Sequence, residues 1–210
     1  MTIDERVAAL ARKLGSAAAA GLEPFGVEEH RMRLLPAVRE SDVIAFEARH
    51  GVRLPEDYRA FIMRVAAGGA GPAYGLVPFD QAVSYDREEL PEERVAKPFP
   101  FVEAYNPFED PAQASYWQRE GSGQLSRDDH LARDAAKAHE TAGSLVLCHE
   151  GCGHLHFLVV NGAAYGQMWV DSTVSDAGYA PLGATFLEWY ERWLDSALAG
   201  GDGVWWMQAR

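Results

Sequence analysis

Three apolar runs in the C-terminal part of the chain are separated by short turns, and this arrangement restricts the fold more than any other sequence feature. The runs span residues 144–149, 154–161 and 166–171, with the density of Val, Leu, Phe and Trp that is typical of strands. Gly151–Cys152–Gly153 marks the first turn and Asn161–Gly162 begins the second. Turns this short join antiparallel neighbours, so the sequence predicts an antiparallel meander.

Helical patterns lie on both sides of this meander. Apolar residues one turn apart predict a helix over 2–20, and a second helix is expected from residue 41 or 42 to residue 51. A third runs from residue 55 to about 68, so the two should form an αα-hairpin. Thr185 and Glu188 have the spacing of a capping box, which predicts the start of the last helix.

The middle of the chain has a weaker pattern. Residues 85–140 are rich in Glu, Asp, Arg and Pro, and we interpret them as an insertion or a loosely packed flank rather than a domain. Within and before this segment, short strands are expected at 76–79 and 99–102, and a mostly polar helix at 126–141.

The charge balance narrows the choice of partner. The chain has 31 acidic and 19 basic residues, a formal net charge of −12. This disfavours binding to the phosphate backbone of nucleic acids, which needs clustered Lys and Arg. It suits a basic protein partner through electrostatic steering. An acidic surface that serves only solubility is the alternative interpretation.

The sequence also bears on compartment. No apolar run approaches the roughly 18 to 20 residues that cross a bilayer, and the N-terminal residues lack the apolar centre of a secretory signal. Two cysteines do not suggest the disulfide framework of a small secreted domain. We therefore expect a cytoplasmic protein without a membrane partner.

A cluster of potential metal ligands lies in the first hairpin of the predicted meander. Cys148, Cys152, His154 and His156 are the candidates, because zinc favours mixed Cys and His ligands. His154 and His156 would point to one face of a strand. Their spacing matches no common zinc finger or ribbon. The alternative is that the cysteines are small buried residues and the histidines belong to the face of a strand.

Aromatic and acidic residues supply candidates for partner binding. Trp169, Trp189 and Trp193 belong to the predicted sheet and last helix, so we expect them in the core. Any of Trp117, Trp205 and Trp206 left exposed would be an interface anchor. In the polar middle, the candidate contacts are Trp117, Glu92, Glu93, Glu109 and Asp110.

Several short segments, taken in order, resemble one known family. They include LPEDYRAF at 54–61, GGAGPAYGL at 68–76, GCG at 151–153 and FLEWY at 186–190. Phe46–Glu47, Gly51, the apolar residues 158–160, Gly166, Trp169 and Asp171 agree with it as well. Together they are similar to the SUKH superfamily, which includes a fungal cell-wall assembly regulator and many bacterial immunity proteins. The resemblance covers roughly residues 40–80 and 143–198.

The resemblance implies an α+β fold in which helices pack on a mostly antiparallel sheet. A single domain would span 41–198, with the polar insertion at about 85–140. An N-terminal helix and connector at 1–40 and a C-terminal tail at 199–210 would extend it. The leading helix and the insertion depart from the compact family pattern, so partner specificity is expected to reside there.

The resemblance also implies a function. It indicates a protein-binding module that has no catalytic residues and needs no cofactor, and that in bacteria often neutralises a toxin, frequently a nuclease. We therefore expect an immunity protein for a basic toxin, with a surface that spans the exposed sheet face, the insertion and Trp117. A metal-binding protein or metal-dependent enzyme is the alternative, and a scaffold for a cellular protein is a third. The sequence leaves the oligomeric state open.

Overall fold

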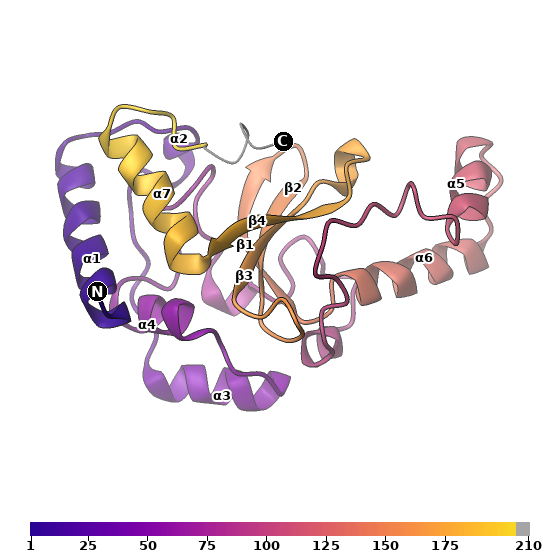
Figure 1. Ribbon diagram of the computed structural model, residues 1–210, viewed down its shortest axis with the longest axis horizontal. Coiled ribbons are helices and arrows are strands. Elements are labelled where there is room, and N and C mark those ends of the chain that lie inside the picture. Colours follow the sequence, from indigo (N-terminus) through magenta and orange to yellow (C-terminus); the bar gives the residue numbers. More distant parts are fainter. Residues whose placement is uncertain (205–210) are drawn as a thin grey trace.

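The computed structural model describes residues 1–204. This part of the chain has an α+β fold with seven α-helices and one four-stranded antiparallel sheet (Figure 1). Three short 3₁₀ helices, η1 to η3, complete it. The elements in chain order are α1 (Ile3–Ala19), α2 (Val27–His30), α3 (Glu40–His50), α4 (Glu56–Arg64), η1 (Phe79–Gln81), η2 (Glu92–Ala96), α5 (Ala114–Gly121), α6 (Arg127–Glu140), β1 (Ser144–Gly151), β2 (His154–Val159), β3 (Gln167–Asp171), η3 (Thr173–Ser175), β4 (Tyr179–Thr185) and α7 (Phe186–Leu198).

The sheet has the order β1-β2-β3-β4, and each strand is antiparallel to its neighbour. Leu145 pairs with Leu158, and Phe157 pairs with Trp169, which confirms the predicted meander. The fourth strand was not predicted, because Pro181 weakens the strand pattern of β4. Proline is tolerated there because β4 lies at an edge of the sheet.

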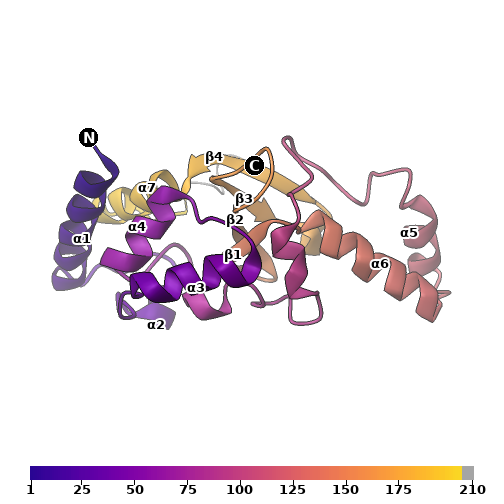
Figure 2. The ribbon, with the colours of Figure 1, turned by 90° about the horizontal axis from the view of Figure 1, so that it is seen from below.

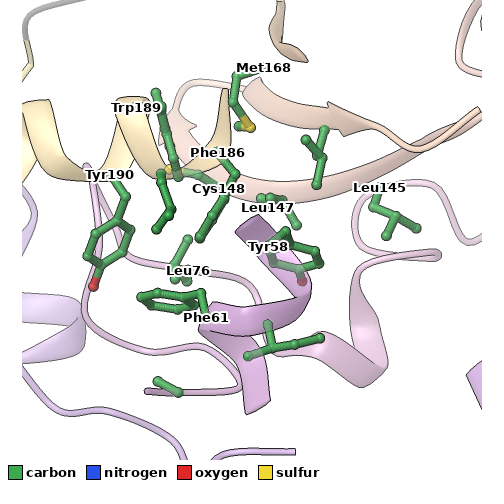
Figure 3. Packing of buried hydrophobic residues seen from close by; sticks show 14 of the residues in the cluster. Tyr58, Phe61, Leu76, Leu145, Leu147, Cys148, Met168, Phe186, Trp189 and Tyr190 are labelled. Carbon is green, nitrogen blue, oxygen red and sulfur yellow. The ribbon is translucent and has the colours of Figure 1, made fainter. Parts of the chain in front are cut away.

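One face of the sheet carries the main core. The aromatic rings of α7 meet those of α4 above the apolar side chains of β1 and β3 (Figure 3). The Phe61 ring lies 5.0 Å from that of Phe186 and 4.9 Å from that of Tyr190. Trp169, Trp189 and Trp193 are all fully buried, as expected from the sequence. Burial of such large aromatic side chains is the main source of stability of this layer.

The leading helix belongs to the same core. Val7, Leu10 and Leu14 of α1 are buried against α4 and α7, and Arg6 forms an ion pair with Glu191 of α7 at 2.7 Å. The helix begins with a capping box between Thr2 and its third residue. The apolar residues whose spacing predicts this helix are therefore the residues that it buries.

The other face of the sheet is covered by the polar middle of the chain. Phe157, Trp169 and Tyr179 point to this face and are fully buried. The Phe99 ring lies 4.9 Å from that of Trp169, and the Tyr105 backbone pairs with Tyr179 of the edge strand β4. The expectation of an exposed sheet face is therefore wrong, because residues 99–105 occupy it.

The remaining helix predictions agree with the structure to within a few residues. α3 begins at Glu40, slightly before the predicted start, and Gly51 ends it at a φ of 62°. A left-handed residue here is what glycine permits. α4 ends at Arg64, earlier than the glycines that were expected to stop it. The last helix begins at the predicted capping box of Thr185 and Glu188.

Two predicted strands are absent from the described part of the chain. In the segment 76–79, Leu76 forms isolated bridges to Gly69 and Cys148, and Phe79 begins η1. In the segment 99–102, Phe99 forms one bridge to Gly162. Both segments are apolar because they cover the edge or face of the sheet, and neither forms a paired strand. The short helix α2 was not predicted.

Helices α5 and α6 form an arm that projects from the sheet at the end of the molecule opposite α1 (Figures 1 and 2). No residue of α5 is buried, and α6 buries only Glu140. The predicted polar helix at 126–141 is thereby confirmed as α6. In the described residues, no helix is long and apolar enough to cross a membrane. Trp205 and Trp206 lie outside the described residues.

Candidate protein-binding surface

The two cysteines of the predicted metal cluster occupy different environments. Cys148 is buried on β1, and its thiol donates a hydrogen bond to the Pro72 carbonyl at 3.1 Å. Burial raises the pKa of this thiol well above its usual range, which disfavours the thiolate that metals and electrophiles require. Cys152 is exposed in the hairpin turn, where its φ is 51°.

The two histidines also have different hydrogen-bond partners. His154 lies 3.1 Å from the Ser172 hydroxyl through Nδ1. The Trp189 indole N–H donates to His156 Nδ1 at 3.2 Å, so His156 carries its proton on Nε2 and donates to the Glu150 carboxylate at 2.9 Å. Across residues 1–204, no group of three or more His, Cys, Asp or Glu side chains could hold a metal ion. The structure therefore does not bring the four candidate ligands together.

Trp117 is half-buried in a small aromatic cluster at the base of α5. Its ring stacks on that of Phe108 at 4.2 Å, and its indole N–H donates to the Pro107 carbonyl at 2.7 Å. The Arg133 guanidinium of α6 lies 5.2 Å from the ring centre, a cation–π contact. Much of the Trp117 side chain is thus used to join the two helices of the arm.

The neighbouring carboxylates of Glu109 and Asp110 differ in exposure and in hydrogen bonding. Glu109 is exposed. Asp110 accepts hydrogen bonds from the Tyr105 hydroxyl at 2.7 Å and from the Ala112 backbone N–H at 2.8 Å. These two bonds lower the pKa of Asp110. Asp110 therefore stabilises the start of the arm, whereas Glu109 is free to meet a partner.

A buried carboxylate fastens the arm to the sheet, and sequence reasoning missed it. Glu140, at the end of α6, accepts hydrogen bonds from Tyr179 of β4 at 3.1 Å, from Gln113 at 2.9 Å and from Arg133 at 2.8 Å. A charged residue with 2% exposure must have such partners. The three partners lie 39, 27 and 7 residues from Glu140 in the chain, so no local sequence signal could have shown the network.

Two arginines beside Glu92 and Glu93 point into the protein. Arg94 is 1% exposed and donates to the Val83 carbonyl at 2.5 Å. Burial, together with nearby Arg87, lowers the pKa of Arg94 to about 9, so the group stays charged at neutral pH. Glu92 and Glu93 are exposed. The cations are therefore directed inward and the carboxylates outward.

Arg87 is held in the same interior by several contacts. Its guanidinium donates to the Ser144 hydroxyl at 3.0 Å, lies 3.6 Å from an oxygen of Asp171, and sits 5.3 Å from the centre of the Phe157 ring. These contacts offset part of the cost of removing the charge from water. The backbone between Arg87 and Arg94 is thus held at both ends by side chains that contact the interior of the protein.

The surface of the polar middle is consequently more acidic than its composition indicates. Residues 85–140 contain thirteen Asp and Glu against seven Lys and Arg, which accounts for half of the formal charge of −12. Arg87 and Arg94 are buried, while Asp86, Glu88 and Glu89 are exposed. The candidate residues Glu92, Glu93 and Glu109 lie on this surface, which we call the acidic surface (the exposed carboxylates of residues 86–134).

The family comparison agrees with the fold. The model of the SMI1/KNR4 family (SUKH-1), a family associated with protein–protein interaction, matches residues 37–192. No curated protein and no solved structure matches the chain. The matched residues include α3, α4, the whole sheet and the start of α7. Because the match extends over most of its length, the chain belongs to the SMI1/KNR4 (SUKH-1) family.

Proposed function

We propose that this protein is a non-catalytic binding module that recognises a basic protein, and that it acts as an immunity protein against a toxin. The observation that carries the proposal is the acidic surface. Arg87 and Arg94 are buried beneath it, while neighbouring carboxylates such as Glu88, Glu89 and Glu93 have no ion-pair partner in residues 1–204. Carboxylates without internal partners attract cationic groups of another molecule.

The mechanism follows from this charge distribution. The acidic surface speeds the encounter with a basic partner, and the complex then covers the partner's own functional surface. Such steering weakens as salt rises, because the Debye length falls to about 8 Å at physiological ionic strength. No bond is made or broken. Cys148 is buried, and its thiol is hydrogen-bonded to a backbone carbonyl, which does not favour a role as a nucleophile.

The proposal is tested by isolating the partner. The tagged chain is expressed in its native host, and proteins that co-purify in stoichiometric amounts are identified by mass spectrometry. We expect a basic protein that inhibits growth when produced alone and that is harmless when produced with this chain. Failure of the chain to protect cells, or the absence of any basic protein in the complex, would reject the immunity role.

A pair of charge reversals locates the surface. Glu92→Lys combined with Glu93→Lys should slow association with that partner by about tenfold or more at low salt, since two attractive charges become repulsive. The matched control is Glu28→Lys with Glu29→Lys, a second exposed pair on α2, away from the acidic surface. Equal slowing by both pairs would show that only total charge matters.

A further inference from the structure

An apolar groove of about 590 Å³ lies beside the acidic surface. It is formed by α3, by the connector that precedes α3, and by the segment that contains η1. The side chains of Leu35, Val38, Ala45, Phe46, Phe79 and Val83 supply its apolar lining. The groove is large enough to hold a large apolar side chain together with its neighbours.

The floor of the groove is fixed by the core. The Phe46 ring lies 4.6 Å from that of Phe79 and 4.5 Å from that of His50. Phe79 is 7% exposed and belongs to the main core, whereas Phe46 is only half-buried. A floor of this kind is preformed, so an incoming side chain gains apolar burial without reorganising the protein.

The border of the groove is acidic. Asp42, Asp80 and Glu92 line it together with one arginine, Arg49, so carboxylates outnumber cationic side chains. Asp42 pairs with Arg39 and Glu92 pairs with Arg49 through side chains that are largely exposed, and pairs of this kind are weak. Asp80 is exposed and has no ion-pair partner in the described residues. Glu92 also belongs to the acidic surface, which therefore adjoins the groove.

We infer that the groove binds a basic segment of the partner protein, with one large apolar side chain of that segment inserted against Phe46 and Phe79. The inference rests on the proposed function, in which the partner is basic. The apolar floor selects Leu, Ile, Met or Phe, and the acidic border selects adjacent Lys or Arg. A second copy of this chain would bring a like net charge of −12 and the same acidic border, so charge repulsion disfavours self-association through the groove.

The test uses a random dodecapeptide library displayed on phage and selected on the immobilised full chain. We expect enrichment of peptides that combine Lys or Arg with a large apolar residue. Selected peptides are then synthesised with a fluorescent label, and their Kd is measured by anisotropy. Enrichment of acidic or wholly polar peptides, or no enrichment at all, would overturn the inference.

Two variants test whether the selected peptides bind in the groove. Ala45 is an exposed residue of α3 that lines the groove, so Ala45→Arg should block it and weaken binding by about tenfold or more. Arginine is a good helix former, and circular dichroism verifies the fold. Asp80→Lys, a surface change, should also weaken binding, with a smaller salt dependence. Ala135→Arg on α6 is the control and should leave Kd unchanged. Unaltered binding to both groove variants would refute the site.

The outcome separates this inference from the proposed function. Peptide selection needs no native partner, so a peptide that binds at Ala45 supports the groove even if no toxin co-purifies. Conversely, a toxin complex that is insensitive to Ala45→Arg and Asp80→Lys leaves the immunity role standing and places its interface elsewhere. A small apolar compound that competes fully with every peptide and is insensitive to Asp80→Lys would show a ligand pocket instead.

Discussion

At the scale of single residues, buried polar groups of this protein are matched to specific partners. His156 is the clearest case, because its two ring nitrogens have different roles. Nδ1 accepts from the Trp189 indole, and Nε2 donates to Glu150. This arrangement links β1, β2 and α7 inside the core. Loss of one partner would leave a fully buried imidazole nitrogen unsatisfied.

We predict that Trp189→Phe destabilises the protein more than Trp193→Phe does. Both side chains are fully buried and lie on α7, so the loss of ring volume is similar. Trp189 donates to His156, whereas the Trp193 indole N–H has no hydrogen-bond partner in the described residues. The additional cost should be about 1–3 kcal/mol. Urea unfolding of the two variants measures it, and equal midpoints would contradict the prediction.

Another residue-scale prediction concerns pH. His30 is buried, and burial lowers its pKa below the ordinary 6.5. The folded state therefore resists protonation, and stability is lost as pH falls through 6.5 toward the lower value in the folded state. Replacement by Asn keeps an acceptor for the Met32 N–H, which His30 Nδ1 binds at 3.1 Å.

We expect the His30→Asn variant to lose less stability than the parent between about pH 7 and pH 5. His50, whose pKa is also lowered by burial, should keep part of the pH dependence in both proteins. The control is His139→Asn, an exposed change on α6. Thermal unfolding across this pH range gives the comparison, and parallel curves for His30→Asn and the parent would rule out His30 as a contributor.

At the scale of elements, the arm depends on polar contacts rather than on a core. One connection to the sheet is the buried Glu140, which accepts from Tyr179 of β4 and from Gln113 and Arg133 on the side of the arm. Elements held in this way open locally at lower cost than core elements do. The arm is therefore the part of the described chain that should respond first to loss of a single side chain.

Glu140→Ala is predicted to release the arm without unfolding the sheet. It removes the carboxylate that forms an ion pair with Arg133 and accepts a hydrogen bond from Tyr179, and breaking a buried ion pair costs about 3–5 kcal/mol. Amide hydrogen exchange should rise in α5 and α6, while α7 and β2 keep their protection. Asp134→Ala, an exposed change on the same helix, should alter neither. A uniform rise in exchange over all elements would mean that the arm is not an independent unit.

The elements differ in how far the sequence predicts them. α1 could be predicted from its apolar stripe and α7 from its capping box and aromatic residues, and β1 to β3 because apolar runs are separated by turn residues. β4 could not, because Pro181 obscures it. The segments 76–79 and 99–102 read as strands because their apolar residues cover the sheet. The Glu140 network and the groove join distant positions, which local patterns do not reveal.

At the scale of the whole molecule, the leading helix and the family-matched region share one core. The family match begins at residue 37, yet Leu10 of α1 is 1% exposed and packs in the same cluster as Phe61 and Trp189. A shared core of this kind unfolds cooperatively. The helix thus contributes to the stability of the domain that follows it.

We predict that Leu10→Ala lowers the free energy of unfolding by about 2–5 kcal/mol, as for other large-to-small changes in cores. Leu131→Ala is the matched control, because Leu131 is 56% exposed on α6. Urea unfolding followed by tryptophan fluorescence and by circular dichroism should show one coincident transition in both proteins. Separate transitions for the two signals would show that α1 unfolds on its own.

Because the side chains of Arg87 and Arg94 point inward, the acidic surface above them can change during evolution without loss of the fold. These two side chains fix the backbone of the loop from inside, through Ser144, Asp171 and Val83. The outward side chains of the loop contribute little to fixing this backbone, so they can be substituted with little effect on the backbone conformation. Descendants of one gene could therefore acquire new binding preferences at these positions while inheriting the same scaffold.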